Sequence, residues 1–232
     1  MSITMLNRKN FSILTLFFII FFTACSSSHN TMKSDEYRQG LLLTREMTNR
    51  FGEYYGNLDY LVYIKGRLLQ HIPDSSDTSY KIIVLNSNDL MAFSPGGGYI
   101  LISKGLIKRC KKEAELAFII AHEISHQYLG HTTLISGTIN PADRNPYSKK
   151  YELAADKLAI AMLASAGYDP NLSISALISA YYYMPAVKET NLSHPDLEER
   201  VASIKSAIAT ANWQPPGTID RRSYQVFLKS IK

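Results

Sequence analysis

Apolar residues recur at helical spacing through the first part of the chain that has a globular pattern. Between residues 35 and about 71 they fall three or four positions apart, and this periodicity predicts one long helix or two shorter ones. The sequence Ile72-Pro73-Asp74-Ser75-Ser76 then predicts a turn. We therefore expect the domain to begin with helix.

Two runs rich in β-branched and aromatic residues follow this helical segment. Residues 80–85 read YKIIVL and residues 99–103 read YILIS, and both patterns predict strands. Between them, residues 94–98 (Ser-Pro-Gly-Gly-Gly) predict a tight turn that leads into the second strand.

Helical spacing dominates the rest of the chain. Apolar periodicity predicts further helices over about 112–130, 149–166, 172–183 and 195–211, and a short C-terminal element follows near 223–231. Gly167 fits the end of the second of these helices, because glycine is common just past a helix C-terminus. This order predicts an α+β fold that is mostly helical, with a small sheet before the helix at 112–130.

The first 25 residues have the pattern of an export signal. Arg8 and Lys9 precede an apolar run over residues 11–22, which is short for a membrane span and typical of a signal-peptide core. The following Phe22-Thr23-Ala24-Cys25 resembles the lipobox of bacterial lipoproteins, in which the cysteine becomes the acylated first residue. Simple secretion and an uncleaved anchor are the alternatives.

Cys25 marks the expected boundary between a signal peptide and the mature protein. Residues 1–24 form the expected signal peptide, residues 25–34 the lipidated cysteine with a polar tether, and residues 35–232 one domain. Ser26 resembles the residue after the cysteine in lipoproteins that are sent to the outer membrane. We expect attachment to the membrane through the lipid, on the periplasmic side of the outer membrane; a soluble periplasmic or secreted protein is the alternative.

Composition narrows the classes of partner. The chain has 232 residues, of which 46% are hydrophobic, and this is enough for one domain with a substantial core. The net charge of +5 is mild, and no basic block is interleaved with aromatic residues, so we expect no nucleic-acid partner. If Cys25 carries lipid, Cys110 has no partner in the chain, and we expect it to be a structural thiol.

The most informative motif is H-E-x-x-H at residues 122–126, which follows an apolar run. Residues four apart on a helix share one face, so His122 and His126 can bind the same metal ion. Glu123 lies beside the first of them, where it can take a proton from a water at an open metal position. The alternative is a core helix whose histidines make ordinary hydrogen bonds.

A third candidate ligand, Glu152, follows 26 residues after His126. With the two histidines it makes a His₂Glu set with an open position, which is the pattern of a catalytic zinc site with one ion per chain. Asp156 lies on the same helix face, where it can accept the outer N–H of a ligating histidine. The alternative is a solvated acidic face in which Asp156 pairs with Lys149 or Lys150.

Four segments carry a resemblance to a known family. They are residues 91–100, which contain Ala-Phe and Pro-Gly-Gly, residues 122–126 with His131, residues 152–156 (E-x-x-A-D) and residues 194–200 (H-P-x-x-x-x-R). In order and spacing, from about residue 80 to 205, they resemble the gluzincin metallopeptidases of the CAAX prenyl-protease and HtpX-like type, and most of all the periplasmic lipoproteins among them. Met91 and Ser125 depart from the Asn and Gly that are common in the family.

The resemblance implies roles for residues that spacing alone does not assign. It places His194 near the metal, either as a reversible fourth ligand or as a donor to the oxyanion of the reaction intermediate. The alternative for His194 is a histidine that precedes Pro195 at a helix start. For Arg200 the options are a contact with the ligand carboxylates, a contact with substrate or a surface salt bridge. His131 is expected to pack against the site or to support it.

The implied function is that of a zinc-dependent metalloendopeptidase of the bacterial envelope with a zincin-like domain. By resemblance, its protein substrates would be misfolded or misassembled envelope proteins. We expect residues 99–103 to be the sheet edge that pairs with an extended peptide substrate. The alternative function is a zinc-bearing latent or inactive protein that acts as a chaperone or assembly factor at the outer membrane.

Overall fold

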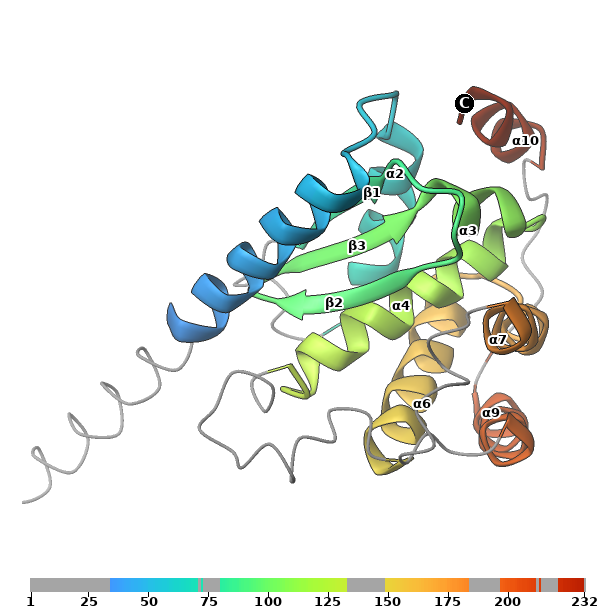
Figure 1. Ribbon diagram of the computed structural model, residues 1–232. Helices are drawn as coiled ribbons and strands as arrows, with labels where there is room; N and C mark the ends of the chain where they lie inside the picture. Colours follow the sequence, from blue (N-terminus) through green and yellow to red (C-terminus); the bar gives the residue numbers. More distant parts are fainter. Residues whose placement is uncertain are drawn as a thin grey trace, which may run out of the picture.

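The computed structural model describes residues 34–70, 72, 80–132, 149–183, 197–211, 213 and 221–231. The expected signal peptide, Cys25 and nearly all of the tether lie outside the described residues, and so does His194. The described part has the expected α+β architecture, which is mostly helical with a small three-stranded sheet (Figure 1).

Three strands form the sheet: β1 (Lys81–Leu85), β2 (Ala92–Gly96) and β3 (Tyr99–Ser103). Their order is β1-β3-β2, and β3 is parallel to β1 and antiparallel to β2. The two expected strands are confirmed. The prediction that residues 99–103 form an edge is wrong, because β3 is the central strand and pairs on both sides; the edges are β1 and β2.

β2 occupies most of the segment that the sequence predicts as a turn. The reversal itself needs only Gly97 and Gly98, which have φ values of 63° and 83° that favour glycine. Pro95 has no backbone N–H to donate, and an edge strand tolerates this because one of its sides is not paired. The register with β3 shifts between Phe93 and Gly96, so this part of the edge is irregular.

The helices largely follow the predicted periodicity. They are residues 34–51, α2 (Asp59–Leu69), α3 (Lys104–Arg109), α4 (Glu113–Tyr128), α6 (Lys149–Ser165), α7 (Leu172–Tyr183), α9 (Leu197–Thr210) and α10 (Arg221–Ser230). The first predicted helical segment is two helices, since Gly52 has a φ of 75° and Glu53 bridges to Leu85 of β1. Within the described ranges, no helix is both long and apolar enough to cross a membrane.

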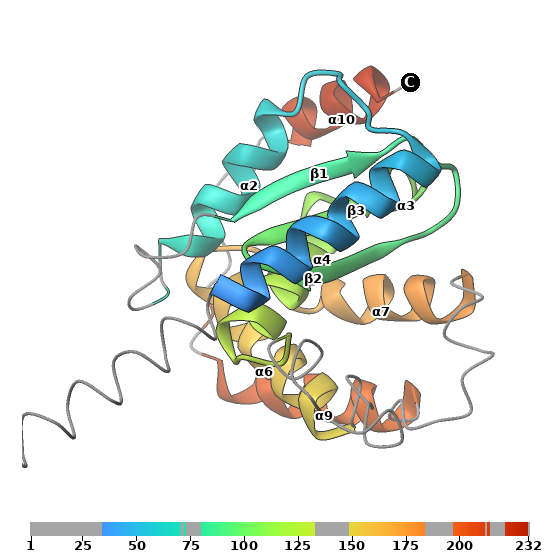
Figure 2. The same ribbon diagram turned by 60° about the vertical axis from the view of Figure 1, so that its left-hand side comes forward.

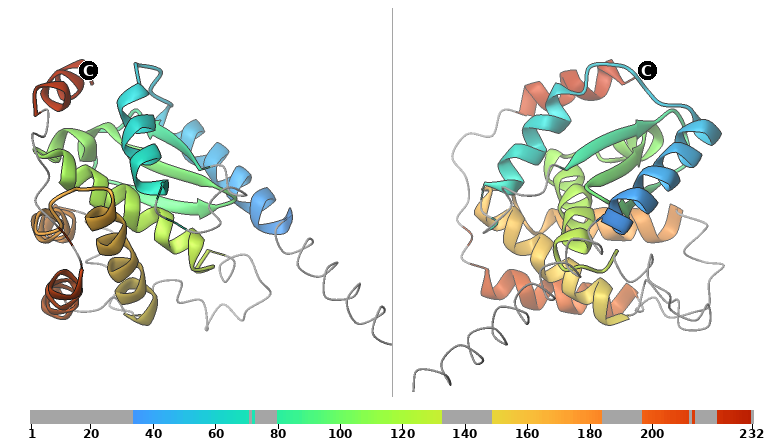
Figure 3. Two further views of the ribbon diagram at one scale, coloured as in Figure 1. Left: turned by 180° about the vertical axis from the view of Figure 1, so that it is seen from behind. Right: turned by 90° about the vertical axis from the view of Figure 1, so that its left-hand side faces the viewer.

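The sheet has a hydrophobic core on each face, because side chains of successive strand residues point to opposite sides. Val84, Ile100 and Ile102 belong to the large core that includes α2 and α4. Ile83, Leu85 and Leu101 form a smaller core on the other face, against which Met47 and Phe51 of helix 34–51 pack. Figure 1 shows helix 34–51 crossing the front of the sheet, and Figure 3 shows α2 and α4 behind it.

α4 runs through the centre of the domain. It contacts the sheet and α2 on one side and α6 and α7 on the other, and α9 lies beyond α6 and α7 (Figure 2). Leu116, Ile120 and Ile124 of α4 are 0% exposed, and burial of each such side chain contributes about 1.5–3 kcal/mol. The helix that carries H-E-x-x-H is therefore held by apolar contacts with the sheet and α2 on one side and with α6 and α7 on the other.

A buried carboxylate anchors the start of α4. Glu113 accepts hydrogen bonds from Tyr60 Oη at 2.8 Å and from Tyr168 Oη at 2.7 Å. The Arg67 guanidinium stacks 4.3 Å from the centroid of the Tyr168 ring, and its Nη1 lies 3.8 Å from Glu113 Oε1. Burial and the Glu113 charge both raise the pKa of Tyr168, so the phenol stays a hydrogen-bond donor. These contacts join α2 and the end of α6 to the first turn of α4.

We predict that Glu113→Gln lowers the free energy of unfolding by about 1–3 kcal/mol, because the amide cannot accept from both phenols and brings a new donor into a buried site. Urea denaturation followed by circular dichroism measures this. Glu46→Gln, on the exposed side of helix 34–51, is the matched control and is expected to change stability by no more than about 0.5 kcal/mol. Equal midpoints for the two variants would contradict the anchoring role of Glu113.

Candidate metal centre

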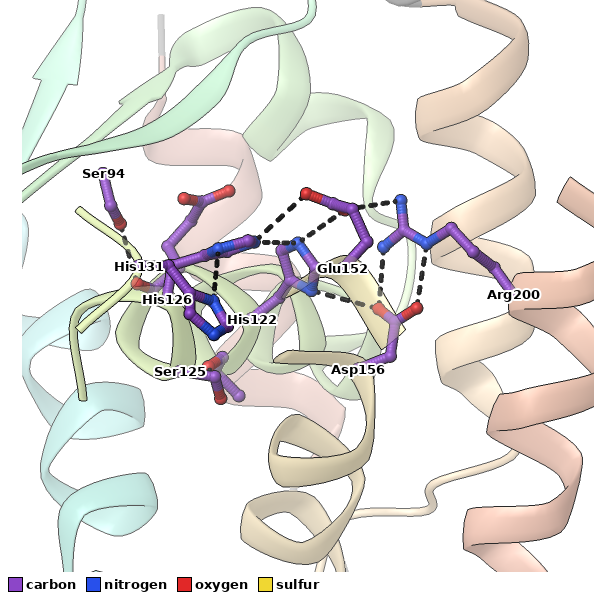
Figure 4. Close-up of polar contacts among 10 residues, drawn as sticks. Ser94, His122, Ser125, His126, His131, Glu152, Asp156 and Arg200 are labelled. Atoms are coloured by element: carbon purple, nitrogen blue, oxygen red, sulfur yellow. Dashed lines mark hydrogen bonds and ion pairs between the residues drawn. The ribbon is translucent and has the colours of Figure 1, made fainter. Parts of the chain in front are cut away.

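The candidate ligands come together where α4 crosses the first turn of α6 (Figure 4). His122 and His126 lie one helical turn apart on α4, and Glu152 begins the buried face of α6. Ala155, which is 0% exposed, keeps α6 narrow at this crossing. Ser125 fills the other side, where its hydroxyl donates to Ala121 O at 2.7 Å. Small residues thus allow the two helices to approach.

The three ligand atoms have the spacing that a metal ion requires. His122 Nε2 lies 3.0 Å from His126 Nε2 and 3.5 Å from Glu152 Oε2, and His126 Nε2 lies 3.4 Å from Glu152 Oε1. Donor atoms bound to zinc at about 2.0–2.2 Å in tetrahedral geometry are roughly 3.3 Å apart. His122, His126 and Glu152 therefore fit a shared ion, and among the described residues they are the group of three that meets this spacing.

Two further residues support this set from behind. Asp156 Oδ1 lies 3.1 Å from His122 Nδ1, on the side of the ring away from Glu152. Arg200 of α9 donates to both oxygens of Asp156, from Nε at 2.8 Å and from Nη2 at 2.7 Å. Its Nη1 lies 3.1 Å from Glu152 Oε2. One guanidinium thus contacts the candidate ligand Glu152 and the carboxylate that orients His122.

The positions of Asp156 and Arg200 do not fit the alternative roles on the protein surface. Asp156 is 0% exposed and faces Arg200, whereas Lys149 pairs with Glu199 and Lys150 is exposed. The Arg200 side chain is only 13% exposed, so its ion pairs are not a surface salt bridge. Of the options for Arg200, the geometry is that of a contact with the ligand carboxylates.

The charges around the rings favour a cation between them. Burial lowers the pKa of His122, but the hydrogen bonds and charges of Asp156 and Glu152 outweigh it and raise the pKa to about 10. Burial likewise opposes ionisation of Glu152, yet the two histidines and Arg200 hold its pKa well below the usual range. A divalent cation at the same place benefits from the same negative potential, because it replaces a proton between the same atoms.

His131 contacts the second ligand on its outer side. Its Nδ1 lies 3.1 Å from Nδ1 of His126, and its ring lies tilted against the Tyr151 ring at a centroid distance of 4.5 Å. Burial, together with the neighbouring His126, lowers the pKa of His131 to about 4. A neutral His131 can accept the N–H of His126, as Asp156 can for His122. The expectation that His131 packs against the site agrees with this position.

Glu123 belongs to α4 and lies where this helix meets β2 of the sheet. The residue is 9% exposed, and its backbone carbonyl accepts a hydrogen bond from Ser94 Oγ of β2 at 2.7 Å. Burial lowers the pKa of Arg200, but Asp156, Glu152 and Glu123 together raise it, so the Glu123 charge acts on the same cluster. His194, the other expected catalytic residue, lies outside the described residues.

Sequence reasoning missed the contacts that join the sheet to this helix. Gln127, next to His126, accepts from Gly98 N at 2.7 Å and donates to Tyr99 O at 2.8 Å. Ser94 makes the second contact, through the carbonyl of Glu123. A glutamine directly after the second histidine, and one helical turn after Glu123, is the signal that the sequence offers.

This arrangement, three candidate metal ligands on two helices beside a small sheet, is consistent with a zincin-like domain. Residues 66–140 match the model of Peptidase family M48, and residues 114–215 match the model of Peptidase U49. The resemblance expected from the motifs is thereby confirmed. Both matched ranges contain His122–His126, and the second also contains Glu152 and Arg200.

Similar proteins carry names of the same class. The mitochondrial metalloendopeptidase OMA1 of Arabidopsis thaliana is 29% identical over 118 residues, which are 41% of this chain and 24% of the relative. The OMA1 of Schizosaccharomyces pombe is 22% identical over 212 residues (77% and 61%), and the beta-barrel assembly-enhancing protease of Escherichia coli K12 is 23% identical over 185 residues (63% and 38%). The chain thus spans between a quarter and three-fifths of the length of these relatives, and the matches support a metallopeptidase.

We predict that Asp156→Asn lowers the affinity for zinc about 10- to 100-fold, because the neutral amide no longer strengthens His122 as a ligand. A competition titration with a chromophoric chelator measures this. Asp35→Asn is the matched control, since the Asp35 side chain is 62% exposed and its ion pair is with Arg38, which is not part of the site. Unchanged zinc affinity in a folded Asp156→Asn variant would contradict the role given to Asp156.

Proposed function

We propose that the protein is a zinc-dependent metalloendopeptidase. The observation that carries this proposal is the convergence of His122, His126 and Glu152 at metal-ligand spacing, with Glu123 directly beside the first ligand. A pure structural zinc site uses four protein ligands, whereas three leave a position for chemistry. The names of the relatives, metalloendopeptidase and protease, point to the same activity.

Each side chain has a distinct task in this proposal. The two histidines and Glu152 hold the ion, which when bound lowers the pKa of a coordinated water and polarises a carbonyl. The carboxylate of Glu123 takes the proton from the attacking water and passes it to the leaving amine. Asp156 and Arg200 keep the ligands oriented and their charges compensated.

β2 is the strand that can align a peptide substrate. It is an edge strand, it packs beside α4, and its Ser94 is hydrogen-bonded to the backbone of Glu123. An extended peptide that pairs with this edge would pass next to the proposed base. Residues 92–96 therefore form the proposed substrate-binding edge, in place of the predicted residues 99–103.

His194 keeps its two proposed roles, a reversible fourth ligand or an oxyanion donor. Its sequence position supports both, because it lies six residues before Arg200, which contacts Glu152 and Asp156. As a fourth ligand it would make the resting protein latent; as a donor it would stabilise the charge that develops on the scissile carbonyl oxygen.

We also propose that the protein is a lipoprotein of the cell envelope and that it acts on misfolded or misassembled envelope proteins. The lipobox-like stretch that ends at Cys25, with Ser26 after it, supports attachment to the periplasmic side of the outer membrane. The printed name of the Escherichia coli relative, a beta-barrel assembly-enhancing protease, supports substrates related to the envelope.

Glu123→Gln is expected to keep one zinc per chain and to lose about 100- to 10,000-fold in turnover, because the ligands stay while the base is removed. Zinc content by atomic absorption and cleavage of casein test this, with Glu46→Gln as the control of matched chemistry. Full activity in Glu123→Gln would rule out the proposed mechanism. A wild-type chain that binds zinc and cleaves nothing would favour the chaperone or assembly-factor alternative.

Cys25→Ser is expected to abolish labelling by an alkyne fatty acid in a Gram-negative host and to release the protein from the membrane pellet. Cys110→Ser is the matched control, because Cys110 is the other of the two cysteines and is buried in the domain. Labelling that persists in Cys25→Ser would contradict the lipoprotein assignment and leave the peptidase proposal untouched.

A further inference from the structure

The turn of the β2–β3 hairpin lies between two helices. On one side, Gln127 of α4 is hydrogen-bonded to Gly98 N and Tyr99 O. On the other side, helix 34–51 crosses the hairpin (Figure 1), and Tyr37 Oη lies 3.3 Å from Tyr99 Oη. The end of the hairpin is therefore held from both sides.

Backbone meets backbone where helix 34–51 crosses this turn. A Cβ atom at Gly40 would lie 2.3 Å from Gly96 O, and one at Gly97 would lie 2.7 Å from the Cα of Tyr37. Both distances are shorter than van der Waals contact allows, so these positions admit only glycine without a shift. Glycine inside a helix costs about 0.5–1 kcal/mol relative to alanine, and the contact with Gly96 explains why residue 40 carries it.

The same helix also contacts the end of the metal helix. Glu36 Oε1 accepts a hydrogen bond from Thr132 Oγ1 at 2.6 Å, and Thr132 is 4% exposed. Thr132 directly follows His131, whose Nδ1 lies 3.1 Å from the outer nitrogen of His126. Helix 34–51 thus bridges the hairpin turn and the segment that backs a candidate ligand.

β2 needs such support because its own ladder is interrupted. The register with β3 shifts between Phe93 and Gly96, so regular pairing does not hold the residues closest to Glu123. Their position depends on Ser94, on Gln127 and on the helix that presses against Gly96.

We propose that helix 34–51 is a positioning element of the peptidase: Gly40 fixes the turn of the β2–β3 hairpin, Glu36 ties the same helix to Thr132 beside the candidate ligands, and together they set the register of the substrate-binding edge over the metal site. This rests on the proposed function, in which β2 binds the peptide. A displaced edge misaligns a bound peptide without removing a metal ligand or the base, so the effect falls on peptide binding more than on the metal.

The test is Gly40→Ala in the full chain loaded with zinc, with Gly66→Ala as the matched control. A Cβ at Gly66 meets nothing within 4 Å, and that variant is expected to behave as wild type. For Gly40→Ala we expect KM for a ten-residue peptide to rise about ten-fold or more, with kcat within about two-fold and zinc affinity unchanged. Hydrogen exchange of residues 92–99 is expected to become faster than in Gly66→Ala.

Glu36 provides a milder second variant pair. Glu36→Ala removes the acceptor for Thr132 and is expected to raise KM in the same direction, whereas Glu36→Gln keeps an acceptor and is expected to restore wild-type KM. Wild-type KM and wild-type exchange in both Gly40→Ala and Glu36→Ala would overturn the proposal. If the wild-type chain cleaves no peptide while Gly40→Ala still speeds exchange in residues 92–99, the peptidase proposal fails and the helix remains a clamp on the hairpin.

Discussion

Two carboxylates buried between α4 and α6 are possible in this domain only because one guanidinium compensates them. Glu152 and Asp156 are 3% and 0% exposed, and removing such charges from water costs several kcal/mol each unless they are paired. Arg200 contacts both, with two hydrogen bonds to Asp156 and an ion pair to Glu152. The position of α9 against α6 follows from this need, and so does the fixed orientation of His122. The metal site is thus built by three helices, although its ligands come from two.

α4, which carries two of the candidate ligands, is also hydrogen-bonded to the β2–β3 hairpin. Ser94 of the edge strand is hydrogen-bonded to the backbone of Glu123, and Gln127 spans the turn of the hairpin from the next turn of the same helix. Both contacts involve main-chain atoms, so they constrain where the strand runs and leave its outward side chains free to vary. An edge strand fixed in this way keeps its place beside α4 even though its own pairing with β3 is irregular.

Local patterns predicted most of the fold, and they failed where neighbours in space decide. Strands β1 and β3 and the longer helices have periodicity of their own, and the pairs His122–His126 and Glu152–Asp156 need only helical spacing. β2 was missed because Ser-Pro-Gly-Gly-Gly has turn composition, and only pairing with β3 makes it a strand. The edge was misassigned for the same reason, since strand order is not a local property. The sequence does not decide among three roles for Arg200, because 44 residues separate it from Asp156. The hydrogen-bond partners of Glu113 are equally hidden in the sequence, since they lie 53 and 55 residues away.

The anchor at Glu113 and the candidate ligands lie at opposite ends of the contact between α4 and α6. The start of α4 meets Tyr168, just after α6, while the start of α6 carries Glu152 to the far half of α4. The two helices are therefore held together at one end by the hydrogen bonds of Glu113 and at the other by Glu152, which also contacts Arg200. An ion shared by the histidines and Glu152 would add a further link between the two helices far from Glu113, so a bound ion would also stabilise the folded domain.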